Sequence, residues 1–204
     1  MLVVVMQIKN VIFDIGNVLV RWAPEEVIKS IFPDADPAHF VKQMRSLWID
    51  LNLGKLTEAE ALFAFQNQLG ISEQEVLTLM LRLKTSQTPI AGSLELLKKL
   101  YIAKVPLYSI TDNVREIIEY HKLNSEFLQY FRGVVVSADV GVLKPDQKIY
   151  RHLLDTYNLV PQESVFIDDV QINVDGALAV GMHSFQFKDS KDCAIKLREM
   201  GINF

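Results

Sequence analysis

Short apolar runs alternate with stretches of helical periodicity along most of this chain. The runs include Val11–Phe13, Val105–Ile110, Val134–Val136 and Val165–Ile167, and apolar residues follow one another in them with few polar interruptions. Strands of this kind are buried on both faces, which is typical of a parallel sheet covered by helices. We therefore predict an α/β fold with a parallel sheet and helices on both of its faces.

A long segment between the first two of these runs has helical periodicity throughout. It extends from about Pro24 to Thr88, and two capping boxes are expected to open helices within it. They pair Thr57 with Glu60 and Ser72 with Glu75. We therefore predict an all-helical cap domain at residues 21–88, inserted into a core domain formed by residues 1–20 and 89–204.

The aromatic residues of the helical segment have two interpretations. Most of them are expected to form the interior of the cap rather than a ligand cage. The two tryptophans, Trp22 and Trp48, are the ones to examine for substrate contact. The aromatics in question are Trp22, Phe40, Trp48, Phe63 and Phe65.

Acidic residues stand where the predicted strands end. Asp14 follows the first apolar run, and Asp168 with Asp169 follows Val165–Ile167. In sheets of this type ligands bind beyond the carboxyl ends of the strands. Carboxylates that converge there repel one another unless a cation neutralises them, and Mg²⁺ accepts such oxygen ligands. The alternative is that Asp168 caps the following helix and that Asp169 is solvated.

Lys144 and Thr111 are further polar candidates at this edge. Pro145 disfavours a helical conformation at Lys144, which we therefore place in a loop just before a helix. Beside the carboxylates its ammonium group would bind a phosphate as a point charge, whereas alone it would be a solvated surface group. The Thr111 hydroxyl would either donate to a phosphate oxygen or cap the helix that begins near Asn113.

Charge and composition exclude several classes of function. The 204 residues carry a formal net charge of −4 without a basic run, so we expect no nucleic-acid partner. Apolar stretches fall far short of the roughly 20 residues that span a membrane, and we expect a cytoplasmic protein with no membrane partner.

Leu2–Val5 is interpreted as an extra stretch of strand or a loose leader, and Cys193 as a packed or idle thiol. The sequence leaves the oligomeric state open.

Four stretches resemble the four ordered motifs of the haloacid dehalogenase (HAD) superfamily. They are residues 13–18, 109–113, 141–146 and 166–173, which read FDIGNV, SITDN, GVLKPD and FIDDVQIN. The first is similar to a subgroup that includes a glucose-1-phosphate phosphatase and the phosphatase domain of soluble epoxide hydrolase. The resemblance covers essentially the whole chain and implies a Rossmann-like core with a helical cap.

The resemblance also implies a reaction and a substrate class. Asp14 would be a nucleophile that forms an aspartyl-phosphate, and Lys144 and Thr111 would bind the transferring phosphoryl group. The substrate would be a small phosphorylated metabolite, for which the subgroup makes a sugar 1-phosphate plausible. The enzyme would thus be a hydrolase that cleaves phosphate monoesters.

A magnesium ion is the cofactor that the resemblance implies. Asp14, Asp169 and the backbone carbonyl of Gly16 would be its protein ligands. Asp168 and Asn173 would lie behind these ligands without contacting the metal. Asp168 would help to orient Lys144.

Two positions depart from the family pattern. Most phosphatases of the family carry an aspartate two residues after the nucleophile, as general acid and base, and here that position is Gly16. Asp112 stands where the family usually has asparagine after the serine or threonine of the second motif. We hypothesise that Asp112 lies at the phosphoryl site and partly replaces the absent carboxylate. The alternative is that Asp112 caps the helix beginning near Asn113.

Two other functions are weighed against the phosphatase. A 2-haloacid dehalogenase also lacks the second aspartate of the first motif, but such enzymes need no metal and lack the paired acids Asp168 and Asp169. A catalytically weak binding protein would fit Gly16 and Asp112. However, a binding module has no need of a nucleophile, a phosphate clamp and a metal ligand together.

Overall fold

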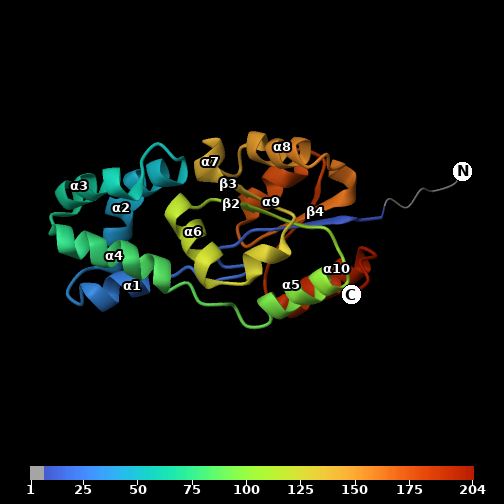
Figure 1. Cartoon of the computed structure of the whole chain (residues 1–204), viewed down its shortest axis with the longest axis horizontal. Coiled ribbons are helices and arrows are strands. Elements are labelled where there is room, and N and C mark those ends of the chain that lie inside the picture. Colours follow the sequence, from blue (N-terminus) through green and yellow to red (C-terminus); the bar gives the residue numbers. More distant parts are fainter. Residues whose placement is uncertain (1–6) are drawn as a thin grey trace, which may run out of the picture.

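Five parallel strands form one sheet in the computed structural model, which describes residues 7–204 (Figure 1). The strand order is β3-β2-β1-β4-β5, so that β1 lies at the centre. The strands are β1 (Asn10–Phe13), β2 (Leu107–Thr111), β3 (Gly133–Val136), β4 (Ser164–Asp168) and β5 (His183–Gln186). The predicted α/β fold is confirmed, while the interpretation of Leu2–Val5 lies outside the described residues.

Helices cover both faces of the sheet, and the three inner strands β2, β1 and β4 are buried along their whole length. In β1, Val11 and Phe13 pack with α5, α6 and α10, whereas Ile12 faces α8 and α9 on the other side. The helices of this part, here called the sheet core, are α5 (Ser93–Ile102), α6 (Arg115–Asn124), α7 (Ser137–Val140), α8 (Gln147–Thr156), α9 (Gln171–Leu178) and α10 (Ser190–Glu199), with short 3-10 turns η1 (Phe127–Tyr130) and η2 (Pro161–Glu163).

Four helices follow β1 and form what we call the helical insertion. They are α1 (Pro24–Ile31), α2 (Pro37–Asn52), α3 (Glu58–Leu69) and α4 (Glu73–Thr85). The capping boxes predicted for α3 and α4 are both present. Phe40 and Phe65 are buried in its apolar interior, as expected, but the expectation for Phe63 is wrong, since its side chain is 72% exposed. Phe63 lies on the outer side of α3 rather than on the face formed by Phe65.

Side chains of the sheet core donate hydrogen bonds to backbone carbonyls of the helical insertion. The Ser137 hydroxyl donates to the carbonyl of Asn52 at 2.7 Å, and Arg115 of α6 donates to the carbonyl of Gly54. Gly54 has a φ of +65° and lies so close to the backbone of Ala138 that a side chain would collide with it. Among residues 7–204 we find no helix with the length and apolar character needed to span a membrane.

Candidate active site

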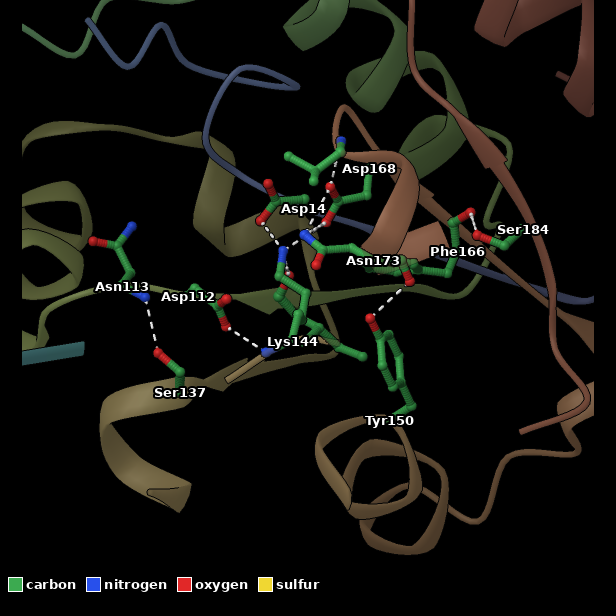
Figure 2. Close-up of polar contacts among 12 residues, drawn as sticks. Asp14, Asp112, Asn113, Ser137, Lys144, Tyr150, Phe166, Asp168, Asn173 and Ser184 are labelled. Atoms are coloured by element: carbon green, nitrogen blue, oxygen red, sulfur yellow. Dashed lines mark hydrogen bonds and ion pairs between the residues drawn. The ribbon is translucent and has the colours of Figure 1, made fainter. Parts of the chain in front are cut away.

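Lys144 is the centre of a buried ion-pair network at the carboxyl edge of the sheet (Figure 2). Its Nζ lies 2.8 Å from Asp14 Oδ1 and 2.6 Å from Asp168 Oδ2, and the Lys144 side chain is 2% exposed. β1 and β4 are neighbours in the sheet, which brings the two carboxylates together. The interpretation of Lys144 as a solvated surface group is therefore wrong.

Asp168 is held by several donors besides Lys144. Its Oδ1 accepts from the backbone N–H of Val170 at 2.8 Å, and both oxygens accept from Asn173 Nδ2 at 3.1 Å. Tyr150 in turn donates to the Asn173 carbonyl at 2.7 Å. Asp168 thus stabilises the turn before α9 and binds Lys144 at the same time. The alternative that it caps the helix is wrong, because Val170 is the N-cap of α9 and has no side-chain capping bond.

Asp112 fixes the loop that carries Lys144. Its Oδ1 accepts from the backbone N–H of Lys144 at 3.1 Å. Helix α6 begins only at Arg115, and its N-cap, Val114, has no side-chain capping bond. The alternative that Asp112 or Thr111 caps this helix is therefore wrong, because the chain turns into the helix later than the pattern indicated.

Asp169 completes a cluster of three acids. Asp14, Asp168 and Asp169 each offer one carboxylate oxygen, and these oxygens lie within 4.8 Å of one another. Asp169 is half-buried, whereas the other two are buried. Hard oxygen ligands in this number suit Mg²⁺, which needs one or two carboxylates besides waters and substrate oxygens. The donor set therefore fits the cation that the motifs imply.

Burial and charge perturb the acid–base properties of the site. Burial raises the pKa of Asp14 to about 7, although Lys144 opposes the shift and Asp168 adds to it. Burial alone would lower the pKa of Lys144, but the surrounding aspartates raise it above its usual range. Burial also raises the pKa values of Asp112 and Asp169. Lys144 thus stays charged among more acids than it can neutralise, which favours a bound cation.

A cavity of about 290 Å³ opens above this network. Most of the predicted site residues line it, but two do not, namely Asp168, which is fully buried, and Thr111, which is 1% exposed at the end of β2. The lining residues are Asp14, Gly16, Asn17, Trp22, Trp48, Asn52, Gln87, Asp112, Asn113, Lys144, Asp169, Val170 and Asn173. The cavity lies between the sheet core and the helical insertion, because residues of both parts line it.

Several lining residues were not singled out from the sequence. Asn17 has a φ of 53°, accepts from the backbone N–H of Trp22 at 2.9 Å and hydrogen-bonds Asp169. The Gly16-Asn17 pair is a turn signal that would have placed Asn17 beside the nucleophile. Asn52 and Gln87 end or follow helices of the insertion, and no local motif distinguishes them.

The chain belongs to the haloacid dehalogenase-like hydrolase family, which matches residues 11–187. It is 27% identical to a sesquiterpene phosphatase from Aspergillus oryzae over 94% of this chain and 96% of that protein. It is 26% identical to a D-ribitol-5-phosphate phosphatase from Bacteroides thetaiotaomicron, over 91% and 94% of the two chains. The protein is thus a HAD-family hydrolase.

Solved structures support the same fold. A HAD-family enzyme from Bacteroides thetaiotaomicron in complex with magnesium and inorganic phosphate matches with a TM-score of 0.74 and 22% identity, over 89% of this chain and 94% of that one. A dehalogenase matches with a TM-score of 0.68 and 16% identity, over 88% and 84% of the two chains. Both likenesses show the shared architecture.

Proposed function

We propose that this protein is a Mg²⁺-dependent phosphatase that hydrolyses small phosphate monoesters through an aspartyl-phosphate. The observation that supports this most directly is the position of Asp14, which pairs with the buried Lys144 and lines the cavity beside Asp169. A nucleophile, a fixed cation and a group of metal-binding oxygens thus converge at one place. The phosphatases among the relatives are consistent with this reaction.

The chain's own residues supply nucleophile and charge. A carboxylate oxygen of Asp14 attacks phosphorus, and the bond from phosphorus to the ester oxygen breaks as the alcohol departs. Water then attacks the aspartyl-phosphate, which releases inorganic phosphate and restores the carboxylate. Lys144, held by Asp168, stabilises the negative charge on the phosphoryl oxygens without having to reorganise. Thr111 is buried at the end of β2 and does not line the cavity, so we assign it no contact with the phosphoryl group.

The departing alcohol needs a proton, and Gly16 offers no side chain for this. Asp112 lines the same cavity, and burial raises its pKa, which favours the protonated form that an acid requires. We therefore assign the proton to Asp112. It would also accept the proton of the attacking water in the second step.

Asp14, Asp169 and the Gly16 carbonyl would hold the magnesium ion. When bound, the cation would neutralise part of the negative charge that this acidic site and the phosphate share. Calorimetric titration of Mg²⁺ into the protein and into the Asp169→Asn variant tests the ligand set. We expect a clear loss of affinity in the variant, and equal affinities would contradict the assignment.

Turnover of p-nitrophenyl phosphate, with Mg²⁺ and with a chelator, tests the function itself. We expect hydrolysis that requires Mg²⁺, and a parallel assay with a 2-haloacid should show no halide release. Halide release without metal would favour the dehalogenase alternative. Inactivity toward both substrates would favour a binding protein.

A further inference from the structure

Two stacked tryptophans line the cavity of the candidate active site. Trp22 follows the nucleophile loop and Trp48 lies in α2, and both line the 290 Å³ cavity together with Asp14 and Lys144. Their ring centroids lie 5.4 Å apart with an angle of 23° between the planes. Both are half-buried, so the wall of the cavity on this side consists largely of aromatic surface.

The same two rings also border a second cavity of about 120 Å³ in the helical insertion. Its lining is predominantly apolar and includes Val41, Met44 and Leu83 besides the exposed Arg45. A dry cavity of roughly 150 Å³ accepts a benzene ring. The second cavity is therefore on the scale of one ring or a short branched alkyl chain, and it adjoins the site through the tryptophans.

The polar groups on this side of the site are few. Besides the tryptophans, the helical insertion and its return connection contribute Asn52 and Gln87 to the active-site cavity, and neither carries a charge. The Gln87 Oε1 is already engaged with His121 Nε2 at 2.8 Å. Asn52 Oδ1 is buried without a partner among the described residues and can accept one hydroxyl. A polyol or a second anionic group would find few partners here.

We propose, building on the phosphatase function above, that the substrate is a phosphate monoester of a predominantly apolar alcohol. Its phosphate lies between Asp14 and Lys144, and its organic group packs on the Trp22–Trp48 pair. Burial of apolar surface on the rings then supplies the binding energy that a sugar would have to obtain from hydrogen bonds. Trp22 and Trp48 are thus specificity-determining residues, and Asn52 accommodates a single hydroxyl.

Binding can be measured without any turnover, because Trp22 and Trp48 are the two tryptophans of the chain. Hexylphosphonate, ethylphosphonate and inorganic phosphate are titrated in the presence of Mg²⁺, and intrinsic fluorescence is recorded. We expect hexylphosphonate to bind about 10-fold or more tightly than ethylphosphonate and to shift the emission, since each buried methylene adds roughly three- to fourfold. Equal affinities with unchanged emission would overturn the proposal.

Turnover of hexyl, ethyl and glucose 1-phosphate then separates this inference from the function on which it rests. We expect kcat/KM for hexyl phosphate to exceed the other two by roughly 10- to 100-fold. Hydrolysis of glucose 1-phosphate or ethyl phosphate in preference to hexyl phosphate would overturn the apolar substrate class and leave the phosphatase intact. Failure to hydrolyse any of the three would overturn the phosphatase as well.

Variants of the aromatic wall provide the control. Trp48→Ala should reduce the hexyl-to-ethyl ratio of kcat/KM by roughly tenfold, and Trp48→Phe, which keeps an aromatic ring, should restore most of it. Phe63→Ala removes an aromatic side chain that is 72% exposed on α3, and it should leave the ratio unchanged. A ratio that stays the same in Trp48→Ala and Trp48→Phe would contradict the assignment, even if one variant is poorly folded.

Discussion

The sheet core and the helical insertion bury their side chains differently. At the edge of the sheet, the Lys144 ammonium and the Asp168 carboxylate are paired with almost no access to water. In the insertion the ion pair of Lys84 with Glu58 is partly exposed, at 18% and 24%, and the interior is apolar. Buried charges are costly for stability, so a fold keeps them chiefly where chemistry requires them. The difference agrees with the proposals that the catalytic residues lie in the sheet core and that the helical insertion contributes apolar contacts.

The largest effect is expected at Asp14. Asp14→Asn should lower turnover of p-nitrophenyl phosphate by about 10³-fold or more, because an amide is a poor nucleophile and a weaker metal ligand. Lys144 keeps Asp168 as a partner, so circular dichroism should show an intact fold. The matched change Asp50→Asn removes a carboxylate of the insertion that pairs with Lys55 at 3.0 Å, and it should preserve activity. Near-normal turnover in Asp14→Asn would exclude the covalent role.

Variants of Lys144 and Lys84 test whether the sheet core and the helical insertion differ in how much their ion pairs contribute to the free energy of unfolding. Lys144→Met leaves buried carboxylates without their cation and should lower the free energy of unfolding by about 3–5 kcal/mol. Lys84→Met removes a partly exposed pair and should cost about 1 kcal/mol or less. Urea unfolding in metal-free buffer measures both. Similar losses in the two variants would mean that the two regions do not differ in the way described.

Asp112 is the next position in order of effect. Asp112→Asn keeps an oxygen that can accept the Lys144 N–H but loses the acid, so the loop should stay in place. Turnover of alkyl phosphates should fall about tenfold or more, because their alcohols are poor leaving groups that need a proton. Turnover of p-nitrophenyl phosphate should change little. An equal effect on both substrates would indicate that Asp112 only positions the loop.

Gly16 offers the reverse experiment, a gain of function. A Cβ built at Gly16 would have the Trp22 Cβ as its nearest neighbour, at 3.9 Å, so the site has room for a side chain there. Gly16→Asp should therefore raise turnover of alkyl phosphates by about two- to tenfold, since it supplies the acid usual in the family. Unchanged or lower turnover would show that Asp112 already fulfils this role, or that a further negative charge repels the phosphate.

Local patterns predicted the elements well and tertiary contacts poorly. The apolar runs, the two capping boxes and the strand-end acids could be read directly, because each depends on residues close in sequence. The burial of Lys144 could not, since it depends on β1 and β4 meeting in space.

In the candidate active site, too, local patterns do not predict contacts between residues that are distant in sequence. Asp14 and Asp169 follow strands and Lys144 lies in the loop before α8, and all three line one cavity. The stack of Trp22 on Trp48 joins residues 26 positions apart on different elements, and no local signal encodes it. The contact between His121 and Gln87 likewise lies beyond sequence patterns, and it links α6 of the core to the chain returning from the insertion.

That contact leads to the smallest effect, a dependence of stability on pH. Burial lowers the pKa of His121, so the unfolded chain binds a proton there more readily than the folded protein. The contribution of neutral His121 to the stability of the folded protein is fully present above the ordinary histidine pKa of about 6.5. It is lost as pH falls from there through the pKa of His121 in the folded protein. A single proton limits the slope to about 1.4 kcal/mol per pH unit.

Urea unfolding at pH 7.5, 6.5 and 5.5 would detect this slope. His121→Gln removes the titrating ring and retains an amide donor for Gln87, so the stability of this variant relative to the unaltered protein should rise as pH falls from 7.5 to 5.5. His152→Gln changes an exposed histidine of α8 and should keep the slope of the unaltered protein. If both variants behave alike, the protonation of His121 does not weaken the link between core and insertion, and the two regions are joined by the contacts of Ser137 and Arg115 instead.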